Sequence, residues 1–260
     1  KTGGKTLPVV FPSADEMMAY DTLLFEVVQN CDDNNDANCP EWDKRANLYV
    51  CSEPTEENAF ATTACQAAVP NEDPELAIAA ETRPCSCTTA ENTTTESTQT
   101  CLEDGTGFGA CNCPCNTAIA RWITTYGREG RWFADISEYL PLYSRGGDMR
   151  IRFTPGNGGY VTTLRFWLTN RDKPDRADEM HALFTGGGFG ETYNDKYEPI
   201  TIDIPADVTR VSLVALISGH GWGTELANCA EFCNHTHHFN VGGDEYVRTH
   251  DNHFFVGSSQ

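Results

Sequence analysis

The chain has 260 residues, with 38 Asp+Glu against 18 Lys+Arg and a formal net charge of -20. Proteins that bind nucleic acid need clustered Lys and Arg to displace phosphate counterions, so neither nucleic acid nor an anionic membrane face is an expected partner. Hydrophobic residues (39%) and aromatic residues (10%) are sufficient for a folded core, but no apolar run reaches the roughly 18 residues that a membrane-spanning helix needs.

Alternating β-forming residues predict strands along most of the chain. The expected strands are Leu23–Val28, Ala46–Val50, Met149–Phe153, Val161–Leu168, Ile200–Ile204 and Val211–Ile217. Short helical turns are expected only at Ser13–Met18 and Asp135–Leu140. Because Gly-rich turns separate these short strands, we expect an all-β protein built from antiparallel sandwiches or jelly rolls.

Twelve cysteines are the most informative feature of the composition. An even number of cysteines in such a chain favours up to six disulfides and a secreted or cell-surface protein. A zinc site is the alternative, but the C-x-C spacing of Cys111, Cys113 and Cys115 differs from the C-x2-C of a zinc knuckle. The polar start at Lys1 shows no signal peptide, so we expect a mature or trimmed chain.

Residues 51–118 differ in composition from the rest of the chain. They hold eight of the twelve cysteines and the Thr-rich run Thr88–Thr100, which includes a glycosylation sequon at Asn92. Such a polar segment buries little apolar area, so disulfides must replace a core. We predict a disulfide-rich insertion in an N-terminal domain (1–172), followed by a charged linker, Asn170–Arg176, and a C-terminal domain (173–260).

Histidine is concentrated near the end of the chain, where six of seven lie in the last 41 residues. On a strand, His235 and His237 would project to the same face and could bind one metal ion. A third ligand would come from His220, His250 or His253. Imidazole suits copper and zinc, and a site without cysteine favours copper. The alternative is a strand edge with solvated or hydrogen-bonded histidines.

Two carboxylates, Asp43 and Glu231, lie in short segments next to cysteines and aromatic residues. Carboxylates in such places can act as general acids or bases, although a structural role is the alternative. The loop Asp32–Asp36 is rich in oxygen ligands, which makes calcium a second candidate cofactor. The loop lacks the glycine and terminal glutamate of an EF-hand, so a solvated acidic turn is the competing interpretation.

Several segments resemble the bacterial peptide:N-glycosidase F family. They are Cys39–Val50 (CPEWDKRANLYV), Arg121–Phe153, Ile217–Gly221 and Cys229–His237 (CAEFCNHTH). The resemblance implies two packed antiparallel jelly rolls with the site between them, and hydrolysis of the amide that links a glycan to asparagine. It implies a glycoprotein or peptide substrate, Asp43 as the principal catalytic aspartate and Glu231 as a second essential carboxylate. It also implies the disulfides Cys31–Cys39 and Cys229–Cys233.

Three departures from that family are visible. The position of a third family carboxylate falls near Thr154, and His220 replaces a tryptophan in the second catalytic segment. We also expect an incomplete second jelly roll, because the chain ends at Gln260 where the family continues. The family enzyme lacks the insertion 51–118.

The stretch His235-Thr236-His237-His238 resembles the H-T-H-H of peptidylglycine α-hydroxylating copper monooxygenases, which share the paired jelly-roll architecture. Three functions therefore remain open. The first is a secreted metal protein, with copper as the expected ion, acting as a monooxygenase-like or copper-capture protein. The second is a glycoamidase that uses Asp43 and Glu231. The third is a non-catalytic extracellular structural or adhesive module that self-associates.

Overall fold

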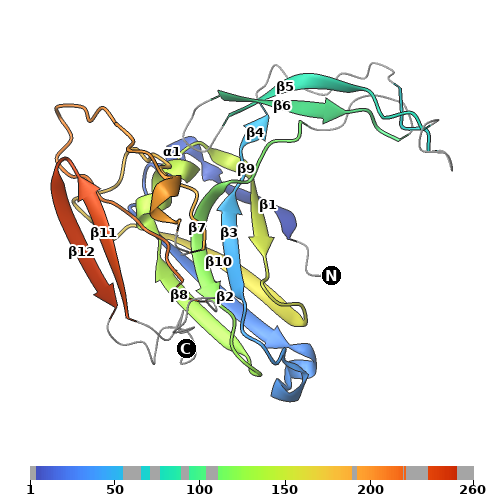
Figure 1. The fold of residues 1–260 in the computed structure, drawn as a ribbon, viewed down its shortest axis with the longest axis horizontal. Coiled ribbons are helices and arrows are strands. Elements are labelled where there is room, and N and C mark those ends of the chain that lie inside the picture. The colour runs from blue at the N-terminus through green and yellow to red at the C-terminus, as the bar shows by residue number, and fades with distance from the viewer. Residues whose placement is uncertain are drawn as a thin grey trace.

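The structure, a computed structural model, describes residues 4–54, 66–70, 77–88, 94–103, 111–188, 192–218, 220 and 234–250. It is all-β, and its sheets are antiparallel, as the strand pattern predicts (Figure 1). In these residues no helix is long and apolar enough to cross a membrane.

Two sheets form a sandwich in the N-terminal half (Figure 1). The first sheet has the order β1-β9-β3-β7, with β1 at Lys5–Ser13, β9 at Gly146–Thr154, β3 at Arg45–Val50 and β7 at Thr117–Ile123. The second has the order β10-β2-β8, with β10 at Tyr160–Thr169, β2 at Thr22–Cys31 and β8 at Gly130–Asp135. Neighbouring strands often come from distant parts of the chain, so non-local pairing builds the sandwich.

The core lies between the two sheets because alternate residues of their strands are apolar. β3 contributes Ala46, Leu48 and Val50, all nearly fully buried, and β2 contributes Leu23, Phe25 and Val27. Each such side chain of the size of Val or Leu stabilises the fold by about 1.5–3 kcal/mol when it is removed from water. The predicted strands at these two places are confirmed, as are those within β9 and β10.

Short helices join the strands at the places that the sequence indicates. α1 (Ala14–Met17) begins with a capping box, in which Ser13 and Glu16 satisfy each other's backbone N–H groups. The 3-10 helix η4 (Ser137–Tyr143) buries Tyr139, Leu140, Leu142 and Tyr143. Three further 3-10 turns are η1 (Asp32–Asn34), η2 (Asp36–Asn38) and η5 (Asn194–Lys196).

A separate three-stranded sheet, β4-β5-β6, extends away from the sandwich (Figure 1). Its strands are β4 (Glu53–Pro54), β5 (Thr82–Thr88) and β6 (Thr94–Thr100). The disulfide Cys51–Cys115 closes the base of this arm, and two further disulfides join β5 to residues 111–113. Residues 94–100 of the Thr-rich run thus form a strand, which the composition did not predict, because β5 supplies the backbone pairing.

The predictions of strands at Ile200–Ile204 and Val211–Ile217 are wrong, since neither segment forms a strand. Their alternating apolar residues are largely exposed, with Val211 64% and Leu213 49% accessible. A strand needs a neighbouring backbone as well as β-forming side chains, and neither segment pairs with a sheet in the described part of the chain. Strands return in the hairpin of β11 (His235–Val241) and β12 (Asp244–His250).

Candidate functional site

Asp43 and His220 meet although 177 positions separate them in the sequence. The Nδ1 atom of His220 lies 3.6 Å from Oδ2 of Asp43, and both side chains are four-fifths buried or more. This distance is longer than a hydrogen bond, so the two side chains are in contact without a direct hydrogen bond between these atoms. A carboxylate from the N-terminal half and a histidine from the C-terminal half therefore form one centre.

The backbone around Asp43 is held on both sides. Lys44 donates its N–H to Thr124 Oγ1 (2.8 Å), and Thr124 returns its own N–H to the Lys44 carbonyl (2.9 Å). On the other side, Pro40 accepts a hydrogen bond from the Gly127 N–H, and the Trp42 carbonyl accepts one from the Asn157 side chain. The loop that carries Asp43 is thus anchored to the ends of β7 and β9 before the chain enters β3.

A disulfide joins Cys31 to Cys39, immediately before this loop. It connects the end of β2 to the segment that leads to Asp43. The disulfide therefore restricts movement of the Asp43 loop relative to β2. This is the pairing that the family resemblance implies. The other implied pairing, Cys229–Cys233, lies outside the described residues, as do Glu231 and His253.

An exposed aromatic pair includes Trp42, the residue directly before Asp43, and the sequence pattern did not identify this pair. Trp42 and Tyr126 are 64% and 59% accessible, and their rings form an edge-to-face pair with centroids 5.8 Å apart. Exposure of large aromatic rings to water is unfavourable, so an exposed pair beside a polar centre offers an apolar surface on which a ligand can pack. The Glu41-Trp42-Asp43 stretch was a signal for this surface, because Trp42 immediately precedes the acid.

Neutral groups surround Thr154, near which the family resemblance implies a third carboxylate. Thr154 pairs with Asn47 across β9 and β3, and the Asn47 side-chain amide donates to Thr154 Oγ1 (3.3 Å). Arg121 Nε in turn donates to Asn47 Oδ1 (2.8 Å). In the described residues, Asp43 is therefore the carboxylate of the centre. Near Thr154 the groups are the neutral pair Asn47–Thr154 and Arg121, which donates a hydrogen bond to Asn47.

The histidines predicted to bind a metal ion are divided between two places. In the hairpin, His235 is the register partner of His250, and His237 is the partner of Arg248. Alternation therefore assigns positions 235, 237 and 250 to one face of the hairpin, although the side chains of His235 and His250 lie outside the description. His220 instead contacts Asp43, while His238 contacts Glu245 at 2.8 Å on the other face.

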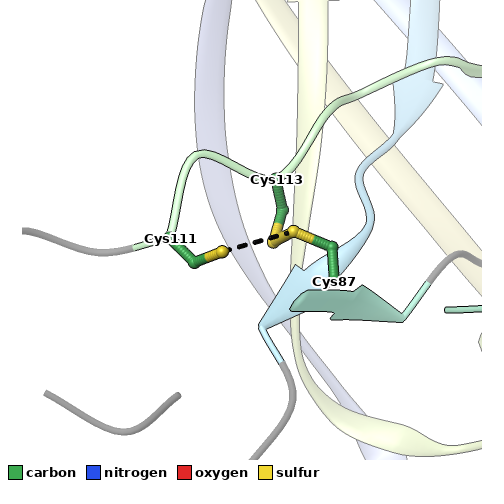
Figure 2. A group of neighbouring side chains, drawn as sticks. All are labelled: Cys87, Cys111 and Cys113. Atoms are coloured by element: carbon green, nitrogen blue, oxygen red, sulfur yellow. Dashed lines mark hydrogen bonds between the residues drawn. A yellow bond between two sulfur atoms is a disulfide. The ribbon is translucent and has the colours of Figure 1, made fainter. Parts of the chain in front are cut away.

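The described residues contain one group of potential metal ligands, formed by Cys87, Cys111 and Cys113 (Figure 2). The sulfur atoms of Cys87 and Cys111 are 3.5 Å apart. However, Cys87 is bonded to Cys113 and Cys111 to Cys85, and a metal ligand must be a thiolate. The group is thus a pair of adjacent disulfides, and every cysteine that the structure describes is oxidised.

The acidic loop Asp32–Asp36, the calcium candidate, forms η1 and η2. Asp36 Oδ1 accepts the N–H of Glu129 (3.1 Å), and Asn35 Oδ1 accepts the N–H of Ala37 (3.1 Å). Two of the oxygens that could bind calcium are thus engaged in hydrogen bonds that hold the turn.

Comparison with protein families gives one match, to the model described as Peptide-N-glycosidase F, C terminal, over residues 189–258. Comparisons with curated proteins and with solved structures find no match. The matched segment includes His220, Glu231 and the hairpin histidines. It supports a protein similar to peptide:N-glycosidase F, whereas the resemblance to copper monooxygenases has no support from these comparisons.

Proposed function

We propose that this protein is a glycoamidase, which hydrolyses the amide between a glycan and an asparagine side chain. The observation that carries the proposal is the contact of Asp43 with His220. The family match covers the segment that contains His220. The His220 side chain of the matched segment therefore lies against Asp43 of the N-terminal half. Glu231, within the same match, is the second carboxylate of the proposal.

The reaction adds water to the side-chain carbonyl of the substrate asparagine. Asp43 accepts a proton from that water as the new C–O bond forms, and the C–N bond then breaks. The leaving glycosylamine nitrogen requires a proton, and we assign its delivery to Glu231. His220 acts as a positioning residue that keeps the Asp43 carboxylate oriented toward the water. The products are an aspartate side chain and a glycosylamine.

The aromatic pair gives this centre a place for the sugar. One face of a sugar ring carries mainly C–H groups, and such a face packs well on an exposed aromatic ring. Trp42 is the immediate neighbour of Asp43 and is 64% accessible. A glycan that lies on Trp42 and Tyr126 would bring its linkage to the asparagine near the carboxylate.

Replacement of Asp43 with asparagine tests the proposal. We expect Asp43→Asn to lower glycan release from a denatured glycopeptide by about 10²–10⁴-fold, because it removes the proton acceptor and keeps the shape. Release is measured by mass spectrometry, which also detects the new aspartate. Asp203→Asn is the matched control, since Asp203 is an exposed aspartate outside the residues assigned to the reaction. Full activity in Asp43→Asn, or no release by the unaltered protein, would reject the glycoamidase.

A metal site on the hairpin is the second candidate, and the pairing of His235 with His250 favours it. Neighbours across a pair of strands have Cβ atoms about 4.5–5.5 Å apart, so positions 235, 237 and 250 suit one shared ion, and copper is the ion that we propose. We expect about one copper per chain in elemental analysis, lost in His235→Ala/His237→Ala and retained in His181→Ala. Copper-free protein, or copper retained in the double variant, would contradict this site.

The protein's location belongs to the same proposal. Disulfides persist in oxidising compartments, and every cysteine that the structure describes is oxidised. We therefore infer a secreted or cell-surface protein. If neither glycan release nor metal is found, a self-associating structural or adhesive module is the remaining class.

A further inference from the structure

The outward face of the first sheet carries an unusual set of arginines. The alternation that buries Ala46 and Leu48 of β3 directs Arg45, Asn47 and Tyr49 away from the core. Arg152 on β9 and Arg121 on β7 belong to the same outward face, because their neighbours Ile151 and Trp122 are buried. We call Arg45, Arg121 and Arg152 the arginine cluster.

The strand register places the three arginines around the same two residues of β3. Arg152 is paired with Tyr49, Arg121 is paired with Asn47, and Arg45 precedes Asn47 by two positions on its face. Directly opposed residues in a sheet have Cβ atoms about 4.5–5.5 Å apart. Three long guanidinium side chains can therefore converge above Asn47 and Tyr49.

No carboxylate of the described residues forms an ion pair with any member of the arginine cluster. Glu53, on the same side of the sheet, pairs instead with Arg150 (3.1 Å) and Arg145 (3.6 Å). Burial lowers the pKa of Arg121, and the like charge of Arg45 lowers it further, while Tyr49 opposes the change. In a chain with a net charge of -20, mutually repelling cations on adjacent strands point to an anion from outside.

The arginine cluster adjoins the proposed active site. Arg121 Nη1 donates to the carbonyl of Leu216 (3.2 Å), four residues before His220. Arg45 follows Asp43 by two residues. The segment that leads to His220 therefore contacts Arg121, and the segment that carries Asp43 continues into Arg45. We expect the arginine cluster to face the same bound substrate.

We propose that Arg45, Arg121 and Arg152 bind an anionic group on the glycan substrate, either a sugar carboxylate or a phosphate ester. The planar fork of guanidinium matches both groups through paired N–H donors. Arg45 and Arg152 are exposed and form no ion pair within the described ranges, whereas Arg150 is already paired with Glu53. The identity of the ligand as a glycan rests on the proposed function, but binding of the anion is measured without turnover.

Calorimetric titration of the whole protein at low salt tests this directly. The probes are 3′-sialyllactose against lactose, and mannose 6-phosphate against mannose. We expect at least one acidic probe to bind at least about tenfold more tightly than its neutral counterpart, because charge-assisted hydrogen bonds are strong. Tighter binding of 3′-sialyllactose than of lactose would indicate a carboxylate ligand. Tighter binding of mannose 6-phosphate than of mannose would indicate a phosphate ligand. Equal binding of acidic and neutral probes in both pairs would overturn the proposal.

A double variant shows whether these residues are responsible. Arg45→Gln/Arg152→Gln should weaken the acidic probe by about tenfold or more and leave its neutral counterpart unchanged. The control Arg171→Gln/Lys196→Gln removes the same charge from two exposed sites. Equal weakening in both variants would show a general charge effect and reject the subsite. Anion binding is measured without turnover, so failure of the glycoamidase and failure of the subsite give different results.

Discussion

At the scale of single residues, Asp21 shows how one carboxylate secures the connection between the two halves of the chain. Its oxygens accept the backbone N–H groups of Arg171 (2.9 Å) and Lys173 (2.7 Å), which belong to the charged segment that we interpreted as a linker. Lys173 also reaches Asp135 through its ammonium group (3.0 Å). The first part of this segment is therefore attached to the sandwich, although its composition indicates only a polar connection.

The hydrogen bond from Thr22 lowers the pKa of Asp21, and burial opposes this while the Arg171 and Lys173 N–H groups add to it. Because the folded pKa is lower than the ordinary value of 3.8, the carboxylate's stabilisation is complete above that value. It is lost as the pH falls below 3.8 through the folded pKa.

Hydrogen exchange at the Arg171 and Lys173 amides tests this attachment. In Asp21→Asn we expect these two amide hydrogens to exchange with solvent faster at neutral pH. The reason is that the asparagine side chain is a weaker hydrogen-bond acceptor than the carboxylate. In the unaltered protein, after correction for intrinsic rates, their protection should fall only in the acid range below 3.8. Asp203→Asn serves as the control. Unchanged protection in Asp21→Asn would show that other contacts hold the segment.

At the scale of elements, β3 and residues 211–217 have similar alternating apolar patterns but different structures. β3 lies between β9 and β7 and buries Leu48 completely. Leu213 is 49% accessible, and its segment pairs with no strand in the described residues. The difference arises from the partners that each segment meets, since both have suitable local propensities.

Truncation of one leucine in each segment measures this difference. Leu48→Ala should lower the free energy of unfolding by about 2–5 kcal/mol, since it leaves a cavity in the core. Leu213→Ala should change it by less than about 0.5 kcal/mol, since the side chain is half-exposed. Urea denaturation followed by tryptophan fluorescence gives both values. A loss in Leu213→Ala as large as that in Leu48→Ala would mean that residues 211–217 are packed like a strand.

At the scale of the whole molecule, three parts are stabilised by different means. The sandwich depends on its core, in which Phe25, Trp122 and Phe153 make ring contacts. The arm β4-β5-β6 depends on disulfides and on strand pairing, and Cys51–Cys115 closes its base. Residues 177–188 and 192–218 form no strand, and they contact the sandwich through Met180 and Leu216. The proposed active site lies where this third part reaches the first.

The sequence by itself determined the local features of this protein. Alternation correctly predicted β2, β3, β9 and β10, because an apolar residue at every second position gives a strand one face to bury. Ser13 was correctly placed at a helix start, since its capping box acts within four residues. The cysteine count likewise predicted disulfides, because spacing excluded a zinc knuckle.

Only the tertiary structure decided which distant groups meet. Asp43 and His220 were selected for two different functions, and the fold brought them together. The arginine cluster was not anticipated at all, because its members lie on three strands whose adjacency follows from pairing. Propensity is a property of a few neighbouring residues, whereas strand pairing and ion pairs depend on segments far apart in the chain. For that reason many of the elements were predictable from the sequence, whereas the partners of each strand and the contacts within the site were not.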